Sequence, residues 1–394
     1  MNALDCGYFE VDIKGIMINA NQSFLAKAQL TLAGMIGKHY RHMVDERQVV
    51  DMYKAFNRVY KNKSLERIRF NYVQHRTGGF RTAEGVIGAI EDPHGVVIGF
   101  RGILFDITEQ VKKEADILAA KQAAENELAI GRKIQYSFLP TQFSQVDGWN
   151  LDVRFHSARE VAGDFYDVFP MSNGARLGFV VADVCDKGVG AAMYMAIFRT
   201  LIRAFANVNV ATNLTKAFDG TNESESMFIR RQKTLAVGAQ PLMNAIQMTN
   251  NYIAQIHGSA NMFATIFMGV LNPQDGKLLY INAGHEPPLV VSNGQIVKRF
   301  EPTGPAVGLM PDLPFSLEEY ELQPNDLLFA YTDGVVDARD AKGQSFSEDR
   351  MLQEILRHAN QPEKIVQNIM GSLDSHISDQ DQFDDITLLG LYRK

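Results

Sequence analysis

Four short acidic segments constrain this 394-residue chain more than any other feature of its sequence. Three of them follow or enclose apolar runs typical of buried strands, and the four are residues 163–167, 182–188, 332–334 and 384–387. A carboxylate at the end of a buried strand is costly unless a cation compensates its charge. A single Asp-Gly pair is typical of a turn, but four such segments favour an oxygen-lined site for hard divalent cations such as Mg²⁺ or Mn²⁺.

The bulk properties of the chain bound its class. A composition that is 46% hydrophobic and 22% charged is typical of globular proteins. A net charge of −7 argues against a nucleic-acid partner, and two cysteines are too few for a disulfide framework. No signal peptide is visible, and no apolar run reaches the roughly 18–20 residues of a spanning helix. We therefore expect a cytoplasmic protein with no membrane span, in which the apolar stretch 191–206, interrupted by Arg199 and Arg203, packs on the core.

Residues 1–107 are predicted to form a small α+β domain. Two strand-like runs come first, helical patterning follows, and three longer strand-like runs joined by Gly-rich turns come last. The expected strands are residues 8–12, 16–20, 66–75, 80–91 and 96–106.

Residues 108–140 are predicted to form a helical linker, because helix-forming residues dominate and Pro140 ends the segment. Apolar or small residues recur at helical spacing, which indicates one apolar seam. We favour a parallel dimeric coiled coil, and a helix lying against its own domain is the alternative. Gly131 is a weak point, costing about 1 kcal/mol relative to alanine. The seam comprises Ile117, Ala120, Ala124, Leu128, Ile134 and Phe138.

Residues 141–394 are predicted to form an α+β sandwich, because strand-like runs alternate with helical stretches through hairpin-like turns. Residues 207–239 are polar, which indicates an insertion. It is either a mobile flap that orders on substrate or an inert surface loop. The expected helices are residues 190–206, 241–256, 349–357 and 362–378.

Several of these segments resemble the motifs of a known family in the right order. The region from Glu127 to Lys394 resembles the bacterial PPM-type serine/threonine phosphatases of the stress-response and sporulation class, which implies an α/β/β/α sandwich. Residues 102–109 resemble the end of a PAS sensor domain, where the last strand leads into a signalling helix. The matching phosphatase motifs are residues 159–167, 282–285, 304–309, 331–335 and 384–387.

The resemblance implies a two-metal site. Asp183 would bridge both metal ions and the carbonyl of Val184 would add a ligand, while Asp164 would hold one ion. Asp333 and Asp384 would hold the other. Asp164 and Asp183 are thus the expected catalytic residues, with two divalent ions, Mn²⁺ or Mg²⁺, as cofactors.

Three further positions have less definite roles. Asp385 either lies behind the ligands or contacts a further ion, and Asp337 resembles the position of a third, weaker metal. Arg159 either orients the substrate phosphate bidentately or forms a surface salt bridge.

The function implied is that of a metal-dependent phosphoserine/phosphothreonine protein phosphatase, regulated by a PAS sensor whose ligand is unknown. The implied substrate is a phosphorylated STAS-type anti-sigma-factor antagonist, and the linker suggests a homodimer. Two alternatives stay open, a catalytically weak or inactive signalling module and a hydrolase of small phosphoesters.

Overall fold

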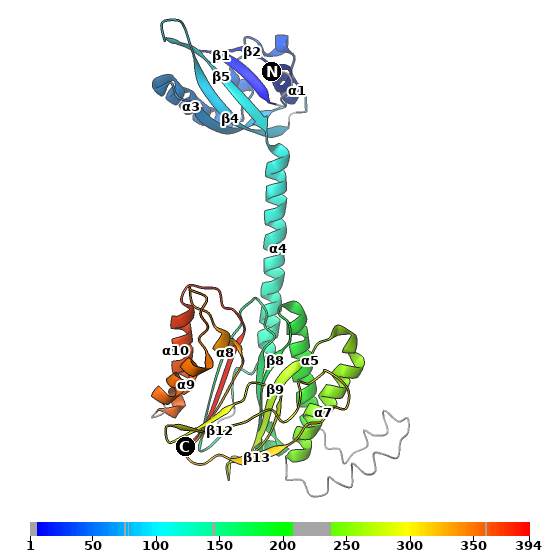
Figure 1. The fold of residues 1–394 in the computed structure, drawn as a ribbon. Helices are drawn as coiled ribbons and strands as arrows, with labels where there is room; N and C mark the ends of the chain where they lie inside the picture. The colour runs from blue at the N-terminus through cyan, green and yellow to red at the C-terminus, as the bar shows by residue number, and fades with distance from the viewer. Residues whose placement is uncertain (1–5, 75, 78, 144–145, 208–237, 359–360) are drawn as a thin grey trace. The chain divides into compact units, whose positions relative to one another are not determined.

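The computed structural model describes residues 6–394 apart from 75, 78, 144–145, 208–237 and 359–360 (Figure 1). The chain divides into two compact units, Met1–Glu125 and Asn126–Lys394. Helix α4 (Thr108–Phe138) crosses the division as one uninterrupted helix. It has the extent expected of the linker, but domain limits at 107 and 140 stay predictions because the division falls inside the helix.

The N-terminal unit is built on a five-stranded antiparallel sheet in the order β2-β1-β5-β4-β3. Each strand lies where the alternation of apolar and polar residues predicts one. The first strand alternates buried and half-buried side chains, as expected of a sheet with one covered face. The strands are β1 (Gly7–Asp12), β2 (Met17–Ala20), β3 (Glu66–Val73), β4 (Phe80–Glu91) and β5 (Val97–Asp106).

Short helices accompany this sheet, as the sequence predicts. The longest, α3 (Val49–Asn62), buries Met52, Phe56 and Val59, which recur at the spacing of one helical face. They join Phe9 and other sheet residues in one core. The arrangement is the PAS-like α+β fold that was expected. The two other α-helices described here are α1 (Gln22–Ala28) and α2 (Leu32–Met35).

Two five-stranded antiparallel sheets form the centre of the C-terminal unit. The first has the order β13-β10-β9-β8-β7 and the second the order β12-β11-β14-β15-β6. Side chains from both sheets, including Phe179, Phe267 and Leu328, form the core between them. The strands are β6 (Trp149–His156), β7 (Phe165–Met171), β8 (Arg176–Val184), β9 (Ala264–Leu271), β10 (Lys277–Ala283), β11 (Leu289–Ser292), β12 (Gln295–Arg299), β13 (Glu318–Glu321), β14 (Leu327–Tyr331) and β15 (Ile386–Arg393).

Helices cover the outer face of each sheet. α5 (Val189–Ala206) and α7 (Ala239–Ile256) pack on the first sheet, while α9 (Glu348–Arg357) and α10 (Ile365–Ile377) lie with the second (Figure 1). The short α8 (Gly334–Asp337) follows β14. The predicted α/β/β/α sandwich is therefore confirmed.

Within the described part of the chain, α5 alone is long and apolar enough to cross a membrane by length and composition. In this structure it packs against α7 and the first sheet. Its two arginines pair with buried Asp167, at 2.6 Å for Arg203 and 3.2 Å for Arg199. The helix thus packs on the core, as the sequence indicates. The insertion expected at 207–239 lies outside the described residues except for its three terminal positions.

Candidate metal centre

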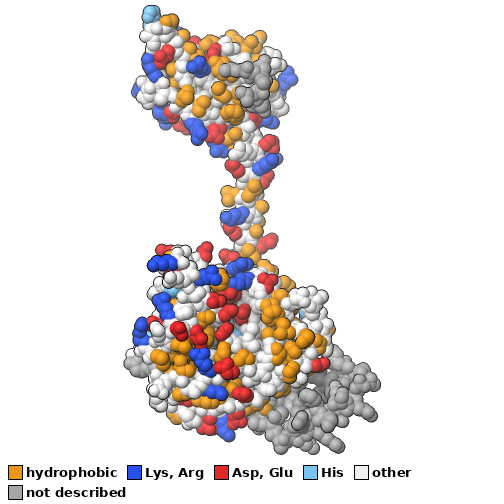
Figure 2. Space-filling view, in the orientation of Figure 1, with side chains coloured by type: hydrophobic (Ala, Val, Ile, Leu, Met, Phe, Trp, Pro, Cys, Tyr) orange, Lys and Arg blue, Asp and Glu red, His pale blue; other side chains and the backbone are white. Residues whose placement is uncertain are grey.

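The four acidic segments meet at one edge of the C-terminal unit. Asp164 directly precedes β7, and Asp183 lies near the end of the antiparallel partner β8. In the second sheet, Asp333 follows β14 and Asp384 precedes its partner β15. Antiparallel pairing brings the end of one strand beside the start of the next, so each sheet contributes two segments to the same edge. The surface view shows acidic side chains gathered on this unit between α8 and α5 (Figure 2).

Two threonine hydroxyls join the sheets at this edge. Thr332 Oγ1 and Thr387 Oγ1 each donate a hydrogen bond of 2.7 Å to Oδ2 of Asp164. All three residues are buried, and the Asp164 side chain is also hydrogen-bonded to Asp183. Asp164 is therefore fixed by contacts from the second sheet, although the chain attaches it to the first.

The pKa values show that the carboxylates repel one another. Burial, together with the charges of Asp333 and Asp384, raises the pKa of Asp183 to about 7. Burial, then Asp183 and Asp385, raise the pKa of Asp164 well above its usual range. The pKa of Asp333 is likewise raised, first by burial and then by Asp384. Oxygen donors that destabilise one another's charge are suited to hard divalent cations, so the residues fit the expected metal ions.

Asp385 supports the loop before β7. Its Oδ1 accepts a 2.7 Å hydrogen bond from the backbone N–H of Ala158, and its Oδ2 accepts one of 2.8 Å from Gly163. Both carboxylate oxygens therefore contact backbone. Of the two roles considered from the sequence, this geometry favours a place behind the ligands over direct coordination.

A lysine that the sequence analysis did not single out lies within the acidic cluster. Lys187 Nζ is 2.7 Å from Oδ2 of Asp384 and donates a 3.1 Å hydrogen bond to the carbonyl of Phe383. Its position as the one cationic residue of the acidic segment 182–188 could have indicated it from the sequence. Lys187 offsets the charge of Asp384, whereas Asp183 and Asp333 face mainly other carboxylates.

The remaining predicted residues lie at the periphery. Asp337 is exposed and contributes to the raised pKa of Asp333, while Arg159 is exposed and forms no ion pair with a described residue. His285 lies in a turn closed by hydrogen bonds with Asn282. Among the described residues, no three Asp, Glu, His or Cys side chains form a ready metal-binding group. Joint coordination by the acidic set stays a prediction.

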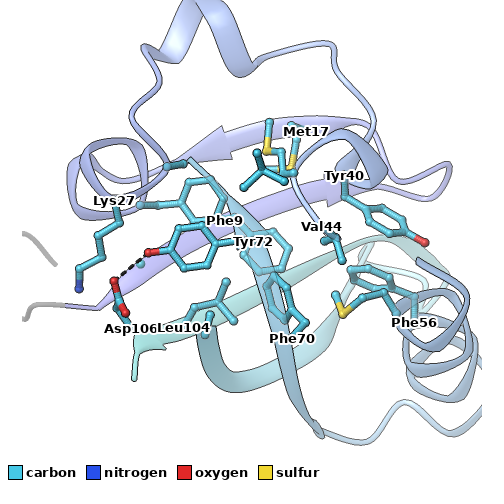
Figure 3. Close-up of a pocket in the computed structure, with 17 residues that line it drawn as sticks. Phe9, Met17, Lys27, Tyr40, Val44, Phe56, Phe70, Tyr72, Leu104 and Asp106 are labelled. Atoms are coloured by element: carbon cyan, nitrogen blue, oxygen red, sulfur yellow. Dashed lines mark hydrogen bonds between the residues drawn. The ribbon is translucent and has the colours of Figure 1, made fainter. Parts of the chain in front are cut away.

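A second candidate site lies inside the N-terminal unit (Figure 3). It is an apolar cavity of about 50 Å³ whose lining includes Phe9, Phe70 and Leu104. Tyr72 and Asp106 also line it, and the Tyr72 hydroxyl donates a 2.8 Å hydrogen bond to Asp106 Oδ2. The cavity offers apolar contact with one polar pair.

The two sheets, their covering helices and the acidic edge define the class of PPM-type (PP2C) phosphatases. The SiaA-PP2C domain of Pseudomonas aeruginosa shares the fold, with a TM-score of 0.53 and 19% identity over 70% of this chain and 99% of that domain. The model of Stage II sporulation protein E (SpoIIE) matches residues 173–394, and the chain belongs to this family.

Two relatives extend the similarity towards the N-terminus. Protein IcfG of Synechocystis is 38% identical over 296 residues, which are 74% of this chain and 46% of IcfG. The phosphoserine phosphatase RsbU of Bacillus subtilis is 24% identical over 277 residues, covering 70% of this chain and 72% of RsbU. The match to IcfG thus spans about half of that protein's length.

Proposed function

We propose that this protein is a metal-dependent protein phosphatase that hydrolyses phosphoserine and phosphothreonine. The observation that carries the proposal is the convergence of buried, mutually repelling carboxylates at one edge of a PP2C-type sandwich. The similarity to the phosphoserine phosphatase RsbU supports the choice of substrate class. A phosphorylated STAS-type anti-sigma-factor antagonist is the specific substrate that we propose.

In this proposal each residue has a defined task. Asp183 would hold both ions and the carbonyl of Val184 would add a ligand, while Asp164 would hold one ion and Asp333 and Asp384 the other. Such ions, when bound, supply charge neutralisation on the phosphoryl group and a nucleophile at neutral pH.

Two further side chains near this site would bind the substrate or orient a metal ligand. Arg159 is exposed, and in this proposal its guanidinium would bind the phosphate of an incoming protein. Lys187, now paired with Asp384, would keep one ligand oriented.

We also propose that the N-terminal unit is a PAS sensor that controls the phosphatase. Its cavity is lined mainly by apolar side chains, and the Tyr72 hydroxyl on its wall contacts Asp106. Asp106 Oδ1 in turn accepts hydrogen bonds from the backbone N–H (3.0 Å) and the hydroxyl (2.6 Å) of Thr108, the first residue of α4. Burial would raise the pKa of Asp106, but these bonds and Arg81 hold it at about 2. A ligand touching Tyr72 would thus act on the start of α4.

The assembly proposed is a cytoplasmic homodimer formed through α4. Its seam residues Ile117 and Ile134 are 69% and 55% exposed. A second copy of the helix would bury them.

The decisive experiment compares hydrolysis of a phosphoserine protein and of p-nitrophenyl phosphate by the full chain, with Mn²⁺ or Mg²⁺. Asp183→Asn is expected to lower phosphoprotein turnover by more than the roughly 100-fold typical of residues behind a metal ligand, because an amide cannot balance two dications. Asp333→Asn should weaken metal binding with a similar loss.

The matched control is Asp379→Asn, which removes an exposed carboxylate in the turn after α10. Near wild-type turnover by both site variants at saturating Mn²⁺ would reject the two-metal assignment. Preference for the small ester over the phosphoprotein would favour the small-molecule alternative, and no hydrolysis of either would favour the inactive module.

A further inference from the structure

Gln135 is the buried residue of α4, with an exposed fraction of 4%. Its side-chain amide pairs with the backbone of a single residue, Ala162. Nε2 donates a 2.6 Å hydrogen bond to the carbonyl of Ala162, and Oε1 accepts one of 2.9 Å from its N–H. Both ends of the amide are thus satisfied by one residue, which fixes the distance and the orientation between helix and loop.

The loop that Gln135 holds contacts the candidate metal centre at three points. Asp164 follows it directly, and the N–H groups of Ala158 and Gly163 within it bind Asp385. Gly163 also packs against the end of β8, since a Cβ there would lie 2.8 Å from the carbonyl oxygen of Val184. A displacement of this loop therefore changes the position of an expected carboxylate ligand and of an expected carbonyl ligand together.

Other contacts from the last turns of α4 reach the same loop. A Cβ at Gly131 would be 3.8 Å from Cγ1 of Val161, and Arg132 lies 3.9 Å from Glu160. These are ordinary contacts between a helix and its neighbour. The amide pairing of Gln135 differs from them because losing it would leave a buried donor and acceptor without partners.

We infer that Gln135 is a positioning residue for the metal centre, through which the C-terminal turns of α4 set the loop that carries Asp164. The inference rests on the proposed function. A rotation or axial shift of α4 moves Gln135, Ala162 follows because it is bonded at both polar groups, and Asp164 and Gly163 move with it. The amide of Gln135 contacts no substrate or metal-ligand side chain, so its effect is on metal affinity first.

The test uses the full chain carrying Gln135→Leu, which keeps the approximate size and removes both hydrogen bonds. We expect Mn²⁺ affinity measured by calorimetry to fall about tenfold, as for other residues that orient metal ligands. At saturating Mn²⁺, the variant should recover most of the turnover that it loses at low Mn²⁺. Hydrogen exchange of the backbone amides at residues 158–164 should quicken even without metal. The matched control is Gln110→Leu, on the exposed first turns of the same helix.

A second variant, Gln135→Glu, covers the case in which the leucine variant does not fold. It keeps an acceptor for the N–H of Ala162 and removes the donor, so an intermediate loss of affinity and intermediate exchange are expected. Unchanged Mn²⁺ affinity together with unchanged exchange, in either folded variant, would overturn the inference. A wild-type chain that binds no Mn²⁺ would contradict the proposed function. Hydrogen exchange in the metal-free protein tests the pairing of Gln135 with Ala162 separately from metal binding.

Discussion

The carboxylates of the acidic edge differ in what their oxygens contact. Asp164 accepts from two threonines, Asp385 accepts from two backbone N–H groups, and Asp384 pairs with a lysine. Asp183 and Asp333 have less compensation, and other carboxylates raise their pKa values. A bound cation would therefore stabilise these two most.

The first residue-scale prediction concerns pH. Because the pKa of Asp183 rises from 3.8 to about 7 on folding, its protonated form is favoured in the folded state, and that stability is present at low pH and lost as pH rises to about 7. In EDTA, wild-type protein should lose free energy of unfolding between pH 4 and pH 7, and Asp183→Asn should lose less. Urea unfolding at both pH values measures the difference. If the free energies of unfolding of Asp183→Asn and wild type changed equally with pH, this prediction would be wrong. The control Asp379→Asn should show the same pH dependence as wild type.

Residue types and order were sufficient to predict the acidic set, because carboxylates at strand ends carry a recognisable cost. They left two roles open for Asp385 and did not indicate Lys187 or Gln135. The contacts of Asp385 with Ala158 join residues more than two hundred positions apart, and only the folded sheets bring them together. No periodicity in the sequence indicates a contact between residues so far apart.

At the scale of elements, two glycines near the site have opposite roles. Gly131 lies inside α4, where an added Cβ would make only an ordinary contact with Val161. Gly163 has no room, since its Cβ would lie 2.8 Å from the Val184 carbonyl oxygen. The first glycine weakens its helix, and the second is required by close packing.

We therefore expect Gly131→Ala to raise the free energy of unfolding of the C-terminal unit by about 1 kcal/mol, the helix-propensity difference. Gly163→Ala should lower it and also weaken Mn²⁺ binding, because the backbone must move away from Val184. Urea unfolding and calorimetry measure the two effects. A destabilising Gly131→Ala would show that α4 is bent or repacked at this position.

The helices and strands themselves were largely predictable, because most carry clear 3.6-residue or two-residue periodicity. α5 and α7 begin within two residues of the expected limits. The order of strands in the two sheets was not predictable from periodicity, since it depends on which strand faces pair. The predicted insertion at 207–239 stays a prediction.

For the whole molecule, the exposed apolar residues of α4 predict a dimer. The double change Ile117→Lys and Ile134→Lys should convert a dimer at micromolar concentration into a monomer, because each charge would have to be buried in the helix pair. Light scattering measures the mass, with Gln122→Lys on the same helix as the control. A wild-type chain that is monomeric by light scattering would contradict the proposed dimer.

The uninterrupted course of α4 has a consequence for the spacing along it. Asp106 fixes its first residue and Gln135 fixes its last turns, with 31 helical residues from Thr108 to Phe138. Each residue added to a helix turns everything beyond it by about 100°. One residue inserted between Ala124 and Leu128 would turn Ile134 and Phe138 away from the earlier residues of the apolar seam, whereas seven would restore their direction to within about 20°. The number of residues in α4 is thus an angular setting for its apolar seam, and we expect a helix pair to tolerate insertions there only in steps of about seven residues.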